Sequence, residues 1–171
     1  MMLGDETDQK PNEEGFRSAQ YDFNSMLKWA NAQGYKIELT FNSYAPNSQF
    51  PYTVLLASPE MMRSYFSFGD LLDFKILPGT LQHIEPYSKV VLSYKVAVFT
   101  VFDTDEQSQL AAYALIKEET PQAIMHVLSS FGKIHSRSPT TLMTGDQAFV
   151  LQAVDELIQH NQYKSHRIDP E

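Results

Sequence analysis

The sequence predicts an α/β (α+β) fold built on a mixed sheet of about five strands with flanking helices. Two segments rich in β-branched and aromatic residues, 90–102 and 109–117, are joined by the short polar turn 104–108, which is typical of antiparallel strands. The amphipathic segments 121–131 and 147–159 then alternate with a short apolar segment. This alternation indicates right-handed crossovers, which add parallel strands to a sheet. We therefore expect three antiparallel strands followed by parallel β-α additions.

The composition limits the class of protein. The chain has 171 residues, of which 43% are hydrophobic and 12% aromatic, enough for one domain with a sizeable core. Its formal net charge of −8 argues against nucleic-acid binding by the bare chain, because phosphate contacts need clustered lysine and arginine. The absence of cysteine excludes disulfides, thiolate zinc sites and cysteine nucleophiles. No apolar run approaches the roughly 18 residues of a membrane span, and no signal peptide opens the chain, so we expect a soluble intracellular protein without a membrane partner.

The N-terminal part divides into a tail and a lead-in. Residues 1–15 are polar and acidic and predict a disordered tail. The lead-in, residues 16–68, has the expected order α-β-β-α. Its first helix is predicted from Ser18 to Gln33 by apolar residues at three-to-four spacing, and Gly34 ends it.

The rest of the lead-in is a hairpin and a second helix. Period-two alternation predicts strands at 35–41 and 52–57, separated by a loop at 42–49. Ser58 then supplies a hydroxyl N-cap before a proline at the first helical position. We expect this helix to run to about Phe66.

Residues 69–160 form the expected core, and residues 161–171 a polar tail. The first core strand is predicted at 70–77 and ends at a Pro-Gly pair. Residues 80–88 are expected to be irregular, and 90–102 to hold one long strand or two short ones.

Two helices and one strand complete the core. Thr120, followed by proline, predicts the start of a helix, and a strand is predicted over 140–144 after a Ser-Pro pair. The buried face of the first helix is expected to use Ile124, Val127, Leu128 and Phe131. The last helix, from Gln147 to about Gln159, is expected to point its own apolar stripe inward.

Several core motifs follow one another in an order that is similar to a known family. They are Gly69 to Asp73, Ala97 to Asp103, Leu110 to Thr120, Thr141 to Thr144 and Gln152 to Val154, with Val54 to Met62 as a matching lead-in. Together they resemble the transposase domain of Mutator-like elements, including the zinc-finger SWIM proteins derived from such elements. The resemblance covers about residues 34–160.

The resemblance implies an incomplete ribonuclease-H-like core and a phosphoryl-transfer chemistry with two Mg²⁺ ions held by three carboxylates. In the family, the first acid ends the first core strand, the second ends the fourth strand, and the third lies on a later helix. Asp73 matches the first position and Asp146 lies next to the second. These two residues are our candidate catalytic and metal-binding residues. The resemblance also implies a location in the nucleus.

The sequence departs from the family pattern in three ways. In the register set by Ala153-Val154, Gly145 occupies the position of the second acid, so Asp146 comes one place late. The chain ends soon after the second core helix, without a third acid. The connection after Asp73 is longer than usual, and an alternative alignment would place the first strand at 89–96, which has no aspartate. We therefore expect a degenerate, inactive site without a cofactor, and the lack of cysteine also excludes the SWIM zinc site.

Structural alternatives stay open at each candidate residue. Asp146 can be the N-cap of the helix that follows it, and Asp73 a strand-end or turn residue. Asp103 is expected in a solvated hairpin turn together with Asp105 and Glu106. We expect no zinc site, because the five histidines show no close ligand spacing.

Three functions are compatible with this sequence. The first is a transposase-derived, catalytically inactive protein that binds a protein partner or a second copy of itself through an exposed sheet edge. The second is a Mg²⁺-dependent nuclease or transposase fragment that acts on DNA through Asp73 and Asp146. The third is a plain protein-interaction domain, whose strand order would differ from the 3-2-1-4 order of the family.

Overall fold

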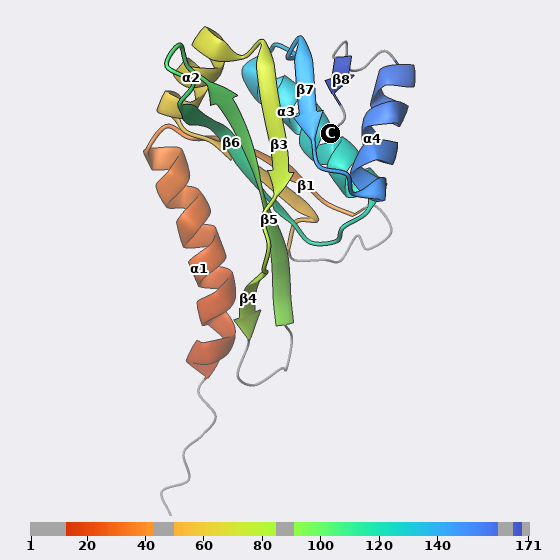
Figure 1. Cartoon of the computed structure of the whole chain (residues 1–171). Helices are drawn as coiled ribbons and strands as arrows, with labels where there is room; N and C mark the ends of the chain where they lie inside the picture. Colours follow the sequence, from red (N-terminus) through yellow and green to blue (C-terminus); the bar gives the residue numbers. More distant parts are fainter. Residues whose placement is uncertain (1–12, 43–49, 85–90, 161–165, 169–171) are drawn as a thin grey trace, which may run out of the picture.

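The computed structural model describes residues 13–42, 50–84, 91–160 and 166–168, and the side chains of 23–42, 50–82 and 93–160 (Figure 1). The helices are α1 (Glu13–Ala32), α2 (Pro59–Phe68), α3 (Pro121–His135) and α4 (Ala148–Gln159). The strands are β1 (Lys36–Thr40), β2 (Thr53–Ala57), β3 (Leu71–Ile76), β4 (Leu81–Ile84), β5 (Val91–Phe102), β6 (Ser108–Ile116), β7 (Thr141–Thr144) and β8 (His166–Ile168).

These strands form one mixed, mostly antiparallel sheet. Its order is β1-β2-β6-β5-β3-β7-β8, and β4 pairs with β5 off this path. Neighbours from β1 to β3 are antiparallel, whereas β3-β7 and β7-β8 are parallel. The α+β class, with an antiparallel set followed by parallel additions, is therefore confirmed. The described strands number eight instead of about five, since β1 and β2 join the sheet of the core and β4 and β8 were not expected.

The main core lies between the sheet and the helices α2, α3 and α4. Figure 1 shows α3 behind the sheet and α4 beside β7. Along β3, Leu72 and Phe74 point into this core, as strand alternation requires. Phe131 of α3 stacks on Phe99 of β5 with ring centroids 4.4 Å apart. The predicted inward residues of α3 are all fully buried, namely Ile124, Val127, Leu128 and Phe131.

A second apolar cluster packs α1 against the first strands. It buries Ala30 of α1 with Val54 and Leu56 of β2, and Phe23 and Leu27 pack against them partly exposed.

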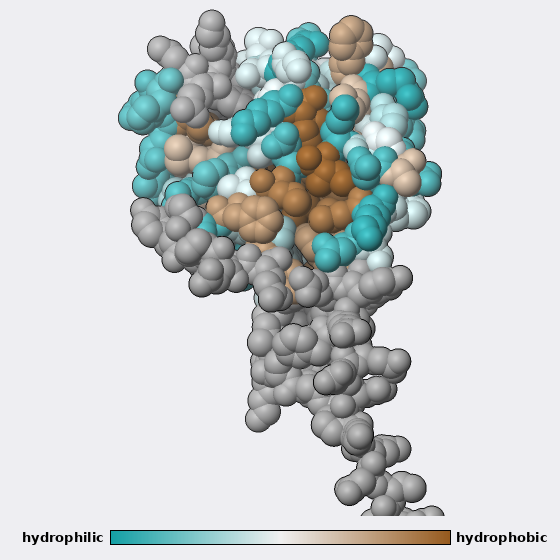
Figure 2. Space-filling model, turned by 180° about the vertical axis from the view of Figure 1, so that it is seen from behind, coloured by the Kyte–Doolittle hydropathy of each residue, from teal (hydrophilic) through white to brown (hydrophobic). Residues whose placement is uncertain are grey.

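Seen from behind, apolar surface gathers near the middle of the molecule within a hydrophilic rim (Figure 2). The large hydrophobic side chains that remain exposed are Met26, Trp29, Leu39, Phe41, Phe66, Leu77, Leu81 and Leu110.

The helix ends follow the predicted local chemistry with one correction. Gly34, at φ 79°, ends α1 as expected, and the Ser58 hydroxyl accepts from the backbone N–H of Met61 at 3.1 Å. However, α1 begins at Glu13, so residues 13–15 are helical instead of part of a disordered tail. Acidic residues favour the positive end of a helix dipole, so the first turn needs no apolar pattern. The rest of that tail, 1–12, lies outside the described residues.

Two short strands correct the expected irregular segments. Within 80–88, β4 pairs with the start of β5, and within the polar tail 161–171, β8 pairs in parallel with β7. Both strands gain order from backbone pairing with an existing strand, which needs no apolar periodicity. The expectation of a merely polar tail at 161–171 is therefore wrong for the residues of β8. The remaining parts of both segments, and the loop at 43–49, lie outside the described residues.

Candidate functional site

Asp73 lies in the middle of β3, where it is 5% exposed. One of its carboxylate oxygens, Oδ2, is 2.8 Å from the ammonium of Lys75 on the same strand. The hydroxyl of Thr100 on β5 donates to this same oxygen at 3.5 Å. Because alternate residues of a strand share a face, Asp73 and Lys75 lie on the face opposite Leu72 and Phe74. The carboxylate is thus held by a cation and a hydroxyl of this chain.

The residues beside Asp73 on the neighbouring strands are not acidic. The register places Thr100 of β5 on one side and Met143 of β7 on the other. Asp146 comes three residues after Met143, beyond the last residue of β7, and three residues of extended chain span about 10 Å. A two-metal site needs carboxylates that bridge ions about 4 Å apart.

Asp146 is exposed in the bend between β7 and α4. The expected N-cap role for Asp146 is wrong, because α4 begins one residue later than predicted and its N-cap is Gln147, which makes no side-chain capping bond. The side chain of Gln147 lies over Gly145, where an added Cβ would be 2.5 Å from Oε1 of that glutamine. Because Gly145 has no side chain, the side chain of Gln147 can occupy this space.

The described residues do not fit the two-metal site that the family resemblance implies. Lys75 already neutralises Asp73, and the positions next to Asp73 carry a hydroxyl and a thioether. Among the described residues, no group of three or more His, Cys, Asp or Glu side chains could hold a metal ion. An inactive site without a cofactor stays the main prediction, and metal binding by Asp73 and Asp146 the alternative.

Thr144, at the end of β7, is a residue that the sequence did not single out. It is 6% exposed beside Phe74, and its hydroxyl has no hydrogen-bond partner among the described residues. Threonine is common in β-strands, so nothing in the sequence distinguishes Thr144 from other strand residues. Its buried unpaired oxygen costs stability.

Asp103 organises the hairpin between β5 and β6, as predicted. Its Oδ1 accepts the backbone N–H groups of Asp105 and Gln107 at 2.9 Å each, and Oδ2 accepts from Gln109 at 3.2 Å. The N–H of Gln107 is the largest cause that lowers the pKa of the Asp103 carboxyl. This residue has a structural role in the turn.

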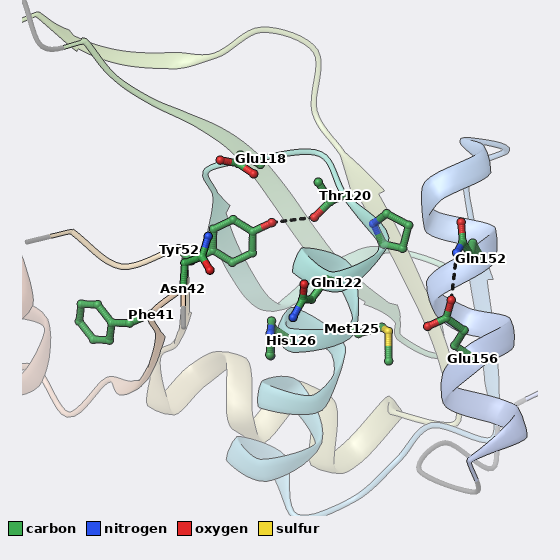
Figure 3. A pocket seen from close by; sticks show the side chains of 11 residues that line it. Phe41, Asn42, Tyr52, Glu118, Thr120, Gln122, Met125, His126, Gln152 and Glu156 are labelled. Atoms are coloured by element: carbon green, nitrogen blue, oxygen red, sulfur yellow. Dashed lines mark hydrogen bonds between the residues drawn. The ribbon is translucent and has the colours of Figure 1, made fainter. Parts of the chain in front are cut away.

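A cavity of about 810 Å³ opens at the start of α3 (Figure 3). At its wall, the hydroxyls of Tyr52 and Thr120 are 2.7 Å apart, and Thr120 also caps the backbone N–H of Ala123 at 3.2 Å. Burial lowers the pKa of His126, and nearby Lys133 adds to this effect. The lining residues are Phe41, Asn42, Tyr52, Glu118, Thr120, Pro121, Gln122, Met125, His126, Gln152 and Glu156. This described lining carries two glutamates and no lysine or arginine, so it does not suit a phosphate group.

No protein-family model matches this chain, and no curated protein is significantly similar to it. No helix in the described part of the chain is long and apolar enough to cross a membrane.

Proposed function

We propose that this chain is a transposase-derived protein that has lost metal-dependent catalysis and acts by binding another macromolecule. The nuclear location belongs to the same proposal and depends on the family resemblance alone. Two features of the chain support it: the order of its core strands, and the surroundings of Asp73.

The strand order supports a transposase origin over an unrelated interaction domain. Taken in chain order, the core strands are β3, β5, β6, β7 and β8, and their order in the sheet is β6-β5-β3-β7-β8. With β4 left out, this order agrees with the 3-2-1-4 order of the family; β1 and β2 are added beyond β6, and β8 beyond β7. Helices α3 and α4 connect β6 to β7 and β7 to β8, as in a ribonuclease-H-like core.

The ion pair between Asp73 and Lys75 is the observation that best supports the proposed loss of catalysis. A carboxylate that holds Mg²⁺ needs its oxygens directed at the ion, but Oδ2 of Asp73 is 2.8 Å from an ammonium. A metal would have to displace this lysine with help from further carboxylates. The neighbouring strands offer Thr100 and Met143 at those positions instead.

Calorimetric titration with Mg²⁺ and Mn²⁺ tests the proposal directly. The wild-type chain and the variants Asp73→Asn and Asp146→Asn are expected to show no saturable binding. Asp105→Asn is the matched control, because Asp105 is an exposed aspartate in the hairpin turn, away from β3 and β7. Saturable binding that both candidate variants lose and the control keeps would overturn the proposal.

A cleavage assay on DNA separates the remaining alternative. With Mn²⁺ present, the wild-type chain is expected to leave linear and supercoiled DNA intact. Cleavage that Asp73→Asn abolishes and Asp105→Asn retains would establish the nuclease function in place of the binding function.

A further inference from the structure

The strand β1 lies at one end of the sheet. Among the described strands it has β2 on one side and no strand on the other. Such an edge presents backbone N–H and C=O groups that can pair with a second chain. No proline lies within Lys36–Thr40 to block this pairing.

The two faces of β1 carry different side chains. Ile37 and the preceding Tyr35 pack toward α1 in the second cluster, and by alternation Leu39 lies on the same face. Lys36 and Glu38 lie on the opposite face, and neither has an ion-pair partner among the described residues. The edge therefore presents an apolar row on one face and two opposite charges on the other.

Apolar surface continues beside this row. Leu39 is 37% exposed, and Trp29 of α1 is 56% exposed with its ring 5.8 Å from the ring of Tyr35. Exposed aromatic and aliphatic side chains next to an unpaired strand edge favour burial against a partner. The partner must present an extended strand with matching apolar and charged positions.

We propose that β1 pairs antiparallel with β1 of a second copy of this chain, about a two-fold axis at Ile37. Lys36 then lies opposite Glu38 of the partner subunit, and symmetry repeats this pair. On the other face, Ile37 meets Ile37 of the partner subunit. This inference rests on the proposed function, because it names the macromolecule that the chain binds as a second copy of itself.

The charges select this register over its neighbours. Residues that lie directly opposite in an antiparallel pair have Cβ atoms about 5 Å apart, so their charges interact. An axis at Glu38 would place two like carboxylates opposite each other. An axis at Leu39 would place Glu38 opposite Thr40 of the partner subunit and leave Lys36 without a carboxylate.

Sedimentation equilibrium over a concentration series tests the dimer. The wild-type chain is expected to show a reversible monomer–dimer equilibrium. Lys36→Glu and Glu38→Lys should each weaken dimerisation about tenfold or more, because each variant makes both symmetric pairs repulsive. Lys133→Glu, an exposed lysine on α3, changes the net charge equally and should leave the equilibrium unchanged.

Two experiments that restore dimerisation identify the register in which the two β1 strands pair. The double variant Lys36→Glu/Glu38→Lys restores unlike pairs and should dimerise as the wild type does. An equimolar mixture of the two single variants should form a heterodimer, since one chain then has glutamate and the other lysine at both positions. Circular dichroism verifies that every variant is folded.

Three results would overturn the inference: a wild-type chain that stays monomeric, single variants that dimerise normally, or a double variant that does not recover. Sedimentation uses neither metal nor DNA. A monomeric chain would therefore leave the calorimetric test of the proposed function intact, and saturable Mg²⁺ binding would equally leave the dimer test intact.

Discussion

The two faces of the sheet are packed to different degrees. On the face covered by α2, α3 and α4, aromatic rings meet directly, with Phe131 stacked on Phe99 and in edge contact with Tyr65 at 4.9 Å. On the face covered by α1, the buried residues are Ala30, Val54 and Leu56, and their neighbours are partly exposed. The first face has a close-packed core, whereas the second is a smaller apolar contact beside the edge strand β1.

This difference indicates how stability is distributed. Elements with many buried apolar contacts open only with global unfolding, while those with few open locally at lower free energy. We expect α1 and β1 to belong to the second kind. The least stable part of the molecule would then lie beside the edge where a second copy is proposed to pair.

Truncation of matched leucines gives the largest expected contrast. Leu128→Ala on α3 removes a fully buried side chain and should lower the free energy of unfolding by about 3 kcal/mol. Leu27→Ala on α1, where the leucine is partly buried, should cost about 1 kcal/mol. Urea denaturation measures both, and equal losses would show that the two faces are packed alike.

The pH dependence of stability should come from the well-packed face. His135 donates through Nε2 to the carbonyl of Ala111 at 3.1 Å and packs against Tyr65 and Phe131. Burial lowers the pKa of His135 to about 4, although its hydrogen bond to Ala111 opposes this shift. From about pH 6.5 down to about 4, the unfolded chain binds a proton that the folded chain does not, so stability falls as the pH is lowered.

His135→Phe should remove this contribution, about 1 to 2 kcal/mol after allowance for the partial exposure of the ring. Thermal unfolding followed from pH 7 to pH 4 measures the slope. A wild-type slope retained by His135→Phe would contradict the assignment.

The smallest expected effect concerns Thr144, a defect within the well-packed face. Thr144→Val removes a buried hydroxyl without a partner among the described residues and should raise the free energy of unfolding by about 1 kcal/mol. Thr141→Val on the same strand, where the side chain is partly exposed, should change stability by less than about 0.5 kcal/mol. A loss of stability in Thr144→Val would mean that the hydroxyl has a partner.

Local sequence signals predicted most elements because they act within a few residues. The Ser58 and Thr120 caps and the Gly34 stop all depend on chain neighbours, and each lies where it was expected. Gly69, which follows α2, is a glycine for a different reason. Its φ is −76°, and an added Cβ would lie 2.4 Å from the carbonyl oxygen of Tyr65, so close approach requires the glycine.

The candidate site was predictable only in part. The sequence placed Asp73 on a core strand, and the family resemblance singled out Asp73 and Asp146. It did not predict that Lys75 would hold the carboxylate of Asp73, because a lysine two residues away on a strand can equally extend into solvent. It also placed the N-cap of α4 one residue early. The neighbours of Asp73 on β5 and β7 depend on strand register, which no local pattern specifies.

The sequence by itself determined the α+β class, the positions of the helices and main strands, and the face that each helix buries, because these depend on periodicity and capping. Only the tertiary structure decided that β4 and β8 are strands, that Asp73 is paired with Lys75, and that β1 lies at the sheet edge. The strands pair residues distant in the chain, and the free energy of that pairing appears only once the sheet is assembled. Asp73 and Lys75 are only two residues apart, but it is their place in the sheet, between β5 and β7, that buries the carboxylate beside Thr100 and Met143.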